Sequence, residues 1–309
     1  MDKLSPEQIF NKTFKYVFFR VLIPIASLAF SLIIMKVISA IMGGVVGWVG
    51  TLIWLIFTVG FAFGVEFFVG YKFHASHVAV VTDAVSVGVI ADDMDAMAKE
   101  LVEYRFPSCN DYLAYSRIVK GSIGQLQKHL NVFLEKKMSV PVLGQLIKLA
   151  QIFVGAALSF AYDLILGYTF WRDGKTLFTS ASDGVAIYYN CWKRIAQNVL
   201  ILAAELIGGM ALLFIFTAAV FMPILAPTYG PLAGGLGGCA VGYFVCTVVK
   251  TVVDSRLMIK LMFPFFEEAQ YADITEEEYN MTCDASPKYK KLYNKALYEA
   301  QTAPQQPQG

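Results

Sequence analysis

Charged side chains are scarce in this sequence. They make up 16% of its 309 residues, whereas an average soluble domain has about 25%. The net charge is +1, so the chain has no basic field that would attract a polyanion. It also has no zinc motif or stacking-aromatic motif that would bind bases. We therefore predict that nucleic acid is not a partner.

Motifs for catalysis and metal binding are missing too. The five cysteines include no C-x-x-C pair, and the three histidines include no H-E-x-x-H pattern. The segment Asp173–Thr176 resembles the end of a phosphate-binding loop, but Thr169 stands where that loop requires a glycine. We therefore predict that the protein is not an enzyme and that it holds no cofactor and no metal ion.

Apolar residues, by contrast, are abundant. They make up 57% of the chain, and the mean hydropathy is +0.55. A transmembrane helix needs about 20 apolar residues to cross a hydrocarbon layer of about 30 Å. Four segments are long enough: Val17–Ile41, Val45–Val69, Ile195–Phe221 and Leu232–Val253. The predicted fold class is all-α, a polytopic helical integral membrane protein with about four full transmembrane helices.

The distribution of Lys and Arg predicts the orientation of these helices, because cytoplasmic segments next to spans carry an excess of both residues. The links 42–44 and 222–231 contain neither residue. Basic residues gather instead in segments 1–20, 72–139 and 171–194 and after Val249. The sequence therefore predicts a plasma-membrane protein whose N- and C-termini are both cytoplasmic.

A fifth apolar region, 140–170, is less uniform because it contains Lys148 and Asp163. The segments on both sides of it are basic, so it must cross the membrane an even number of times or not at all. We interpret it as a re-entrant or interfacial hairpin with Gly155 near the bend. Two short spans, which would give six spans in total, are the alternative.

These assignments divide the chain into parts. Residues 1–16 are the cytoplasmic N-terminus, and residues 17–265 are the membrane domain, with a cytoplasmic amphipathic insert at 76–139. Residues 266–309 form a cytoplasmic tail that we expect to be disordered from about residue 301. In the insert, apolar residues recur at helical spacing on one face: Val119, Ile123, Leu126, Leu130 and Phe133.

Glycines recur every four residues in the last span and form one stripe on its surface: Gly230, Gly234, Gly238 and Gly242. In lipid, hydrophobicity does not drive helices together, and small residues at this spacing let two backbones approach closely. We therefore predict that this stripe packs against another helix.

One carboxylate, Glu205, interrupts the apolar stretch Leu200–Phe216. At about 1.5 Å per residue it lies about 16 Å beyond Arg194, near the middle of the bilayer. A charge at that depth costs at least about 2.5 kcal/mol, so such residues usually face a cavity or a partner. Lys250, or a bound proton, would neutralise it. Glu205 therefore marks either a transport path or an internal clamp, by which we mean a structural pair that holds helices together.

Other charges lie near the ends of the spans. Lys250 and Asp254 have i,i+4 spacing and can pair on one helix. Glu66 lies near the cytoplasmic end of the second span. Together with Glu205, these three residues are our candidates for a transport path.

Three stretches resemble choline transporter-like membrane proteins. They are "GKTLFTSASDGVAIYYNCWKRI" at 174–195, "VVDSRLMIKLMF" at 252–263 and "KGSIGQLQKHL" at 120–130. The similarity covers residues 120–268 of a chain much shorter than that family, which has roughly twice as many spans. The resemblance implies a transporter-like bundle with 171–194 in the cytoplasm. It carries no ligand-binding residue over to this chain.

The sequence thus predicts a multi-pass membrane protein that transports a small solute or ion. Glu205 would line the path, and Lys250 and Asp254 would act as coupled charges. The alternative is a non-transporting membrane scaffold or assembly subunit, in which the glycine stripe and the amphipathic helices bind partners. The expected partners are the lipid bilayer and the transported solute or ion, with a homo-oligomer left open.

Overall fold

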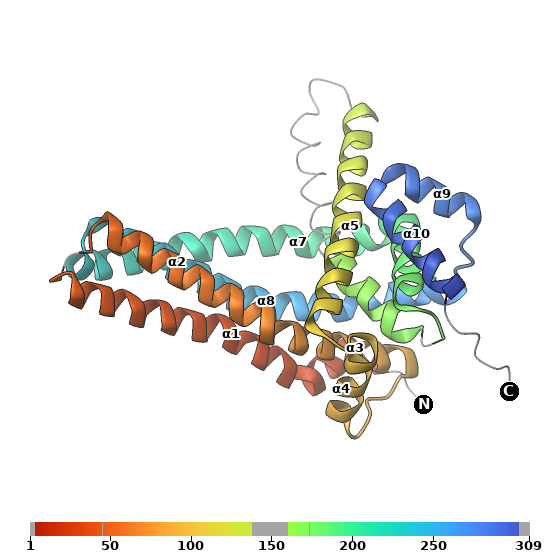
Figure 1. Ribbon diagram of the computed structural model, residues 1–309, viewed down its shortest axis with the longest axis horizontal. Helices are drawn as coiled ribbons and strands as arrows, with labels where there is room; N and C mark the ends of the chain where they lie inside the picture. Colours follow the sequence, from red (N-terminus) through yellow and green to blue (C-terminus); the bar gives the residue numbers. More distant parts are fainter. Residues whose placement is uncertain (1–3, 45, 138–159, 173, 303–309) are drawn as a thin grey trace. The chain divides into compact units, whose positions relative to one another are not determined.

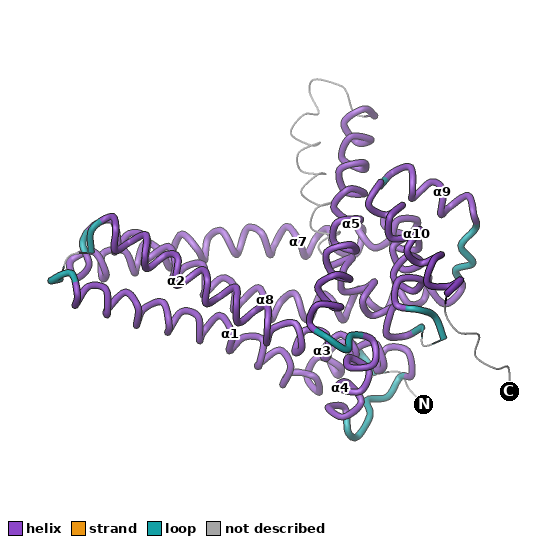
Figure 2. Tube along the Cα trace, viewed as in Figure 1, coloured by secondary structure: helices purple, strands orange, loops and turns teal. Residues whose placement is uncertain are grey.

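The computed structural model describes residues 4–44, 46–137, 160–172 and 174–302, with their side chains except at 133–137 and 193–208. Every regular element in this part of the chain is a helix (Figure 1, Figure 2). The elements are α1 (Pro6–Ile41), α2 (Trp48–Val65), the π-helix η1 (Glu66–Gly70), α3 (Tyr71–Val87), α4 (Met94–Arg105), α5 (Cys109–Lys137), α7 (Leu177–Tyr229), α8 (Pro231–Tyr271), α9 (Glu276–Ala285) and α10 (Pro287–Thr302). The all-α prediction is confirmed.

Four helical stretches in the described residues are long and apolar enough to cross a membrane. They are Pro6–Ile41, Trp48–Val87, Gly209–Tyr229 and Pro231–Tyr271. Each contains or overlaps one of the four spans predicted from the sequence. By length and composition, the chain is therefore a multi-pass α-helical integral membrane protein.

The chain forms two compact units. The insert unit consists of Met1–Asn11, Ala75–Ala204 and Leu257–Gly309, and the bundle unit consists of Lys12–His74 and Glu205–Arg256. The insert unit thus combines the N-terminal segment, the polar insert and the tail. These are the segments that the charge distribution predicts to lie on one side of the membrane.

The bundle unit is built from two helical hairpins. Residues of α1 and α2 form the first, which turns at Gly43 (φ +77°) and Gly44 (φ +114°), and residues of α7 and α8 form the second. Gly230, expected on the packing stripe, instead closes this second turn with φ +87°, a conformation that glycine adopts without strain. The N–H of Val46 donates to the carbonyl of Tyr229 at 3.1 Å and joins the two turns.

Helix α8 comes very close to α7 along the other glycines. A Cβ atom added at Gly234 would lie 2.4 Å from the Cα of Ala226, and one added at Gly238 would lie 2.8 Å from the backbone N of Met222. At Gly242 the nearest atoms of α7 would lie at 3.2 Å. The absence of side chains at these three positions therefore sets the separation of the two helices.

Helices α1 and α2 are joined by a buried polar seam. The indole N–H of Trp54 donates to the carbonyl of Ser31 at 3.0 Å and to its Oγ at 3.1 Å. The hydroxyl of Thr58 donates to the same Oγ at 3.1 Å. Nearby, the rings of Phe30 and Phe61 stack with centroids 3.9 Å apart. Because buried polar groups need partners where water is absent, these bonds hold the first hairpin in one register.

The insert unit is organised around a helix at 160–171. Residues 160–170 are all buried except Asp163, which is half-buried. On α5, the Tyr115 hydroxyl hydrogen-bonds with the hydroxyl of Thr169 at 2.8 Å. A helix buried on nearly all sides in this way forms the core of the unit.

The hairpin expected over 140–170 overlaps this helix only in part. Residues 138–159, including the expected bend at Gly155, lie outside the described residues. The described end of the region is covered by protein: a Cβ atom at Gly167 would meet Thr82 of α3 at 2.7 Å and Met262 of α8 at 3.1 Å.

Helix α5 follows the amphipathic pattern of the sequence. The residues of its apolar face are buried, at Val119, Ile123, Leu126 and Leu130, while the side chain of Phe133 lies outside the described residues. Helix α10 packs beside α5 (Figure 1). The tail of the same chain therefore packs against this helix, with the hydroxyl of Ser286 donating to the carbonyl of Ser122 at 3.3 Å.

The tail is folded through α9 and α10. Thr275 and Glu278 form a reciprocal capping box at the start of α9, which satisfies two orphan backbone donors. The hydroxyl of Ser286 accepts a bond from the N–H of Tyr289 at 3.0 Å and caps α10. Helix α10 continues to Thr302, and the rest of the segment expected to be disordered, 303–309, lies outside the described residues.

Candidate functional site

Glu205, the carboxylate of the apolar stretch, lies within α7. Its side chain is among those at 193–208 that the structure does not describe. Its role as part of a path or as a clamp therefore stays a prediction.

Lys250 and Asp254 form an i,i+4 ion pair on α8. The side chain of Lys250 is 57% exposed, and that of Asp254 is 20% exposed. An ion pair that closes within one exposed helix turn contributes little to stability in water. Neither residue lines the groove that the bundle unit contains.

This groove, of about 760 Å³, is lined by residues of α1, α2, η1 and α8, with Phe214 added from α7. Its walls are mainly apolar, and several of the lining side chains are exposed, including Leu55, Val59, Phe63 and Leu236. Apolar surface of this kind is unfavourable in water but costs nothing against lipid chains. We call this cavity the bundle groove.

Charged and hydroxyl side chains lie at one end of the bundle groove. Arg20, Glu66 and Thr251 line it, and the guanidinium Nη1 of Arg20 donates to the hydroxyl of Ser255, one turn after Thr251, at 3.3 Å. This bond places the start of the first span level with the end of the last one. The second span, which runs antiparallel to the first, brings Glu66 to the same level. We call the part of the groove lined by Arg20, Glu66 and Thr251 its head end.

Ser27 lines the groove beyond the head end. It is 1% exposed, and its hydroxyl has no hydrogen-bond partner among the described residues. An unsatisfied buried hydroxyl costs about 1–3 kcal/mol. A ligand in the groove that offers a polar atom to Ser27 would remove that cost.

Glu66 begins the π-helical turn η1, and it is exposed. Its carboxyl group lies over Gly70, the last residue of the same turn: a Cβ atom there would come within 2.7 Å of Oε2. A π-turn is rare and often occurs at functional positions. Here the wide turn and the glycine leave room for the carboxylate beside the groove.

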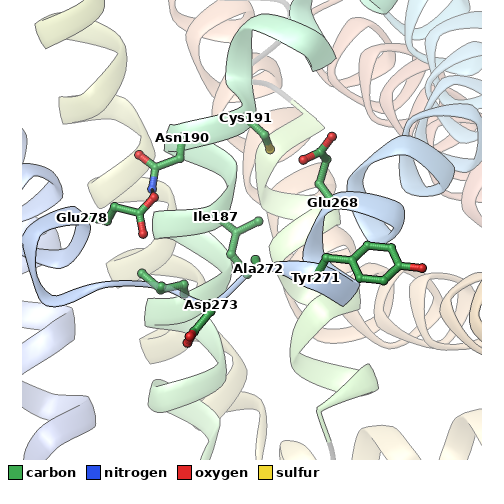
Figure 3. A pocket seen from close by; sticks show the side chains of 9 residues that line it. Ile187, Asn190, Cys191, Glu268, Tyr271, Ala272, Asp273 and Glu278 are labelled. Atoms are coloured by element: carbon green, nitrogen blue, oxygen red, sulfur yellow. Dashed lines mark hydrogen bonds between the residues drawn. The ribbon is translucent and has the colours of Figure 1, made fainter.

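A second cavity, of about 440 Å³, lies in the insert unit (Figure 3). Its walls include the carboxylates of Glu268, Asp273 and Glu278, and the side-chain amide of Asn190 donates to Glu278 at 3.0 Å. Glu278 already takes part in the capping box of α9. No group of three or more His, Cys, Asp or Glu side chains in the described residues could hold a metal ion.

A buried carboxylate, Asp183, connects α7 with α9. Lys175 donates to one of its oxygens at 2.6 Å, and the hydroxyl of Tyr279 donates to the other at 2.6 Å. Burial, reinforced by the bond to Asp183, raises the pKa of Tyr279 above its usual range. Beside this pair, the hydroxyls of Ser182 and Tyr289 are bonded at 3.1 Å. Within the insert unit, this network attaches the tail to the start of α7.

The sequence reasoning missed most of the groove residues and found only Glu66 among them. A signal was present, because hydroxyl residues recur every four positions on two spans. They are Ser27 and Ser31 on the first, and Thr247, Thr251 and Ser255 on the last. In lipid such residues often bond within or between helices, so the spacing alone could not separate packing from ligand binding.

Comparison with known protein families, with curated proteins and with solved structures finds no match for this chain. The resemblance of 174–195 to choline transporter-like proteins therefore stays a prediction.

Proposed function

We propose that this integral membrane protein transports an amphipathic, lipid-like solute through the bundle groove. The observation that carries the proposal is the groove itself, a large apolar cavity with charged groups at its head end. Along its wall lies the hydroxyl of Ser27, which has no hydrogen-bond partner in the described part of the chain. An apolar chain would lie against the aliphatic and aromatic walls. A polar head would meet Arg20 and Glu66.

The composition of the walls fits such a solute better than a bare ion. A small ion in a mainly apolar groove would lose its hydration and gain few ligands. A molecule with an apolar chain instead gains about 0.8 kcal/mol per buried CH₂ group relative to water. The hydroxyl oxygens of Ser27, Thr58 and Thr247 recur along the groove, so a polar head that donates hydrogen bonds would find acceptors beyond the head end.

The length of the groove supports movement rather than simple solvation by a neighbouring lipid. Along α8 the lining extends from Leu236 to Thr251, about 22 Å at about 1.5 Å per residue. Half of a hydrocarbon core of about 30 Å is about 15 Å. A groove of this length reaches past the middle of the bilayer when its helices lie close to the membrane normal.

The proposal includes the orientation predicted from the charges. The N-terminal segment, the insert and the tail belong to one unit, as an even number of crossings requires. With the positive-inside rule, this supports both termini in the cytoplasm, and the plasma membrane stays the expected location.

The first test is lipid movement between leaflets in proteoliposomes, measured with a fluorescent phospholipid. Ala240→Phe places a ring in the groove, because Ala240 lines it. Ala219→Phe adds the same ring at an exposed position of α7 outside the lining. We expect transfer to fall by at least about tenfold, or about 1.4 kcal/mol in the barrier, in Ala240→Phe only. Wild-type transfer no faster than in protein-free vesicles would overturn the proposal.

Glu205→Gln tests whether this carboxylate belongs to the path. If it does, the well-folded variant loses transfer of the labelled phospholipid while eluting as a monodisperse particle. If Glu205 is a clamp, the variant loses its monodisperse peak together with its activity. Unchanged transfer in a stable variant would remove Glu205 from both roles.

A non-transporting scaffold or assembly subunit is the second candidate. The observation that favours it is the folded insert unit, which collects three separate parts of the chain. This reading expects a lipid to stay bound in the groove without crossing between leaflets, so the transfer assay separates the two functions.

A further inference from the structure

The bundle groove has charges of both signs at one end. Arg20 and Glu66 both line it, from α1 and from η1. They lie at the level where α1 meets the end of the last span, because Arg20 bonds to Ser255 at 3.3 Å. A ligand whose head reaches this end therefore meets a cation and an anion.

Arg20 suits a phosphate group. A guanidinium has five N–H donors in a planar fork, and one of its terminal nitrogens donates to Ser255. That bond orients the guanidinium beside the groove. A phosphate is the anion that such a fork binds with two parallel hydrogen bonds.

Glu66 suits an ammonium group. Its carboxylate is exposed beside the groove and lies over Gly70, whose missing side chain leaves it space. Carboxylates accept hydrogen bonds only, so their natural partner is a cation that donates N–H groups. An anionic head without such a cation would be repelled by Glu66.

We propose that the head end selects a zwitterionic phospholipid, with its phosphate on Arg20 and its ammonium group on Glu66. This inference rests on the proposed function and names the substrate class of the same groove. Charge complementarity supports this selection. In a medium of low dielectric constant, a head with one charge leaves either Arg20 or Glu66 without a counter-charge, whereas a zwitterionic head satisfies both.

The test uses the full-length protein in detergent, exchanged against an equimolar mixture of phosphatidylethanolamine and phosphatidylglycerol with identical acyl chains. Retained lipids are counted by mass spectrometry of the intact complex. We expect the wild type to prefer phosphatidylethanolamine by about tenfold, the effect of one satisfied charge pair. Glu66→Gln should bring this ratio to about one by removing that pair, and Arg20→Gln should weaken retention of both lipids.

The matched control is Lys72→Gln, which removes a charge close to Glu66 in sequence but outside the groove lining. It should keep the wild-type ratio. If Glu66→Gln does not fold, Gly70→Ala replaces it, because a Cβ atom there displaces the carboxylate and should lower the ratio.

The outcomes separate the two claims. Retention of both lipids in equal amounts by the wild type overturns the head-group inference but leaves the groove as a lipid site. A ratio that changes equally in Lys72→Gln and Glu66→Gln also overturns it. Retention of neither lipid contradicts the proposed function itself.

Discussion

Large apolar side chains are arranged differently in the insert unit and in the bundle unit. In the insert unit, Tyr115, Tyr168 and Phe265 are at most 2% exposed. In the bundle unit, Ile56 and Phe57 are 70% and 55% exposed. The insert unit therefore has the buried core of a protein that folds in water. The bundle unit exposes similar side chains to a solvent that must itself be apolar.

The forces that hold the two units together differ accordingly. Burial of apolar surface stabilises the insert unit, whose large side chains are enclosed in its core. In the bundle unit that driving force is absent between helices, and close packing and hydrogen bonds replace it. The glycines of α8 and the seam of Trp54, Ser31 and Thr58 provide them.

The largest expected difference is between removing a buried ring from the insert unit and removing an exposed ring from the bundle unit. Phe265→Ala should destabilise the insert unit by about 3–5 kcal/mol, because it leaves a cavity in a buried core. Phe57→Ala should have little effect in detergent or lipid, since its ring is exposed and lies outside the groove lining. Thermal unfolding of both variants in the same detergent checks this. Equal losses of thermal stability in the two variants would show that the units do not differ in solvation.

A smaller effect is expected from a single added methyl group in the bundle. Gly234→Ala should cost about 1–3 kcal/mol, since its Cβ atom would overlap the backbone of Ala226. Gly235→Ala is the matched control, because a Cβ atom there meets nothing within 4 Å. Chemical unfolding should find Gly235→Ala as stable as the wild type or slightly more so. A loss of the same size in both would indicate that helix separation is not set by the stripe.

The smallest effect concerns the hydroxyl of Tyr279. Tyr279→Phe should cost about 1 kcal/mol, the net value of its bond to Asp183. The folded state raises the pKa of Tyr279. The contribution of its hydroxyl bond to the free energy of unfolding is therefore present below about pH 10 and is lost as the pH rises above that value. Above that pH, the rate of amide hydrogen exchange in α9 and α10 should therefore rise less steeply in Tyr279→Phe than in the wild type.

Parallel slopes for Tyr279→Phe and the wild type would contradict this account. Tyr298→Phe is a useful control, because Tyr298 lies on α10 of the same tail but is 67% exposed, while the hydroxyl bond to Asp183 belongs to Tyr279. It should keep the alkaline slope of the wild type.

Parts of the fold could be predicted because they follow local rules. The four spans follow from apolar length, and the buried face of α5 follows from helical spacing. The cap at Ser286 follows from its position before Pro287. Gly230 shows the limit of a periodic rule, since it continues the four-residue pattern but occupies a turn with positive φ.

The candidate site was less predictable because it depends on contacts between distant parts of the chain. Glu66 could be singled out as a charge in an apolar segment. Arg20 could not, because an arginine near the end of a span usually reaches the membrane surface. Its bond to Ser255, far along the chain, is what brings it to the groove.

Composition and periodicity alone determined that this chain is an all-α membrane protein, with four long apolar helices in the part that the structure describes. These properties depend on the solubility of each segment, which its own residues decide. The tertiary structure alone decided that the tail packs against α5, that 160–171 is a buried core helix, and that Arg20 and Glu66 share a groove. Such arrangements depend on which helix faces meet, and that choice is made by the packing of residues far apart in the sequence.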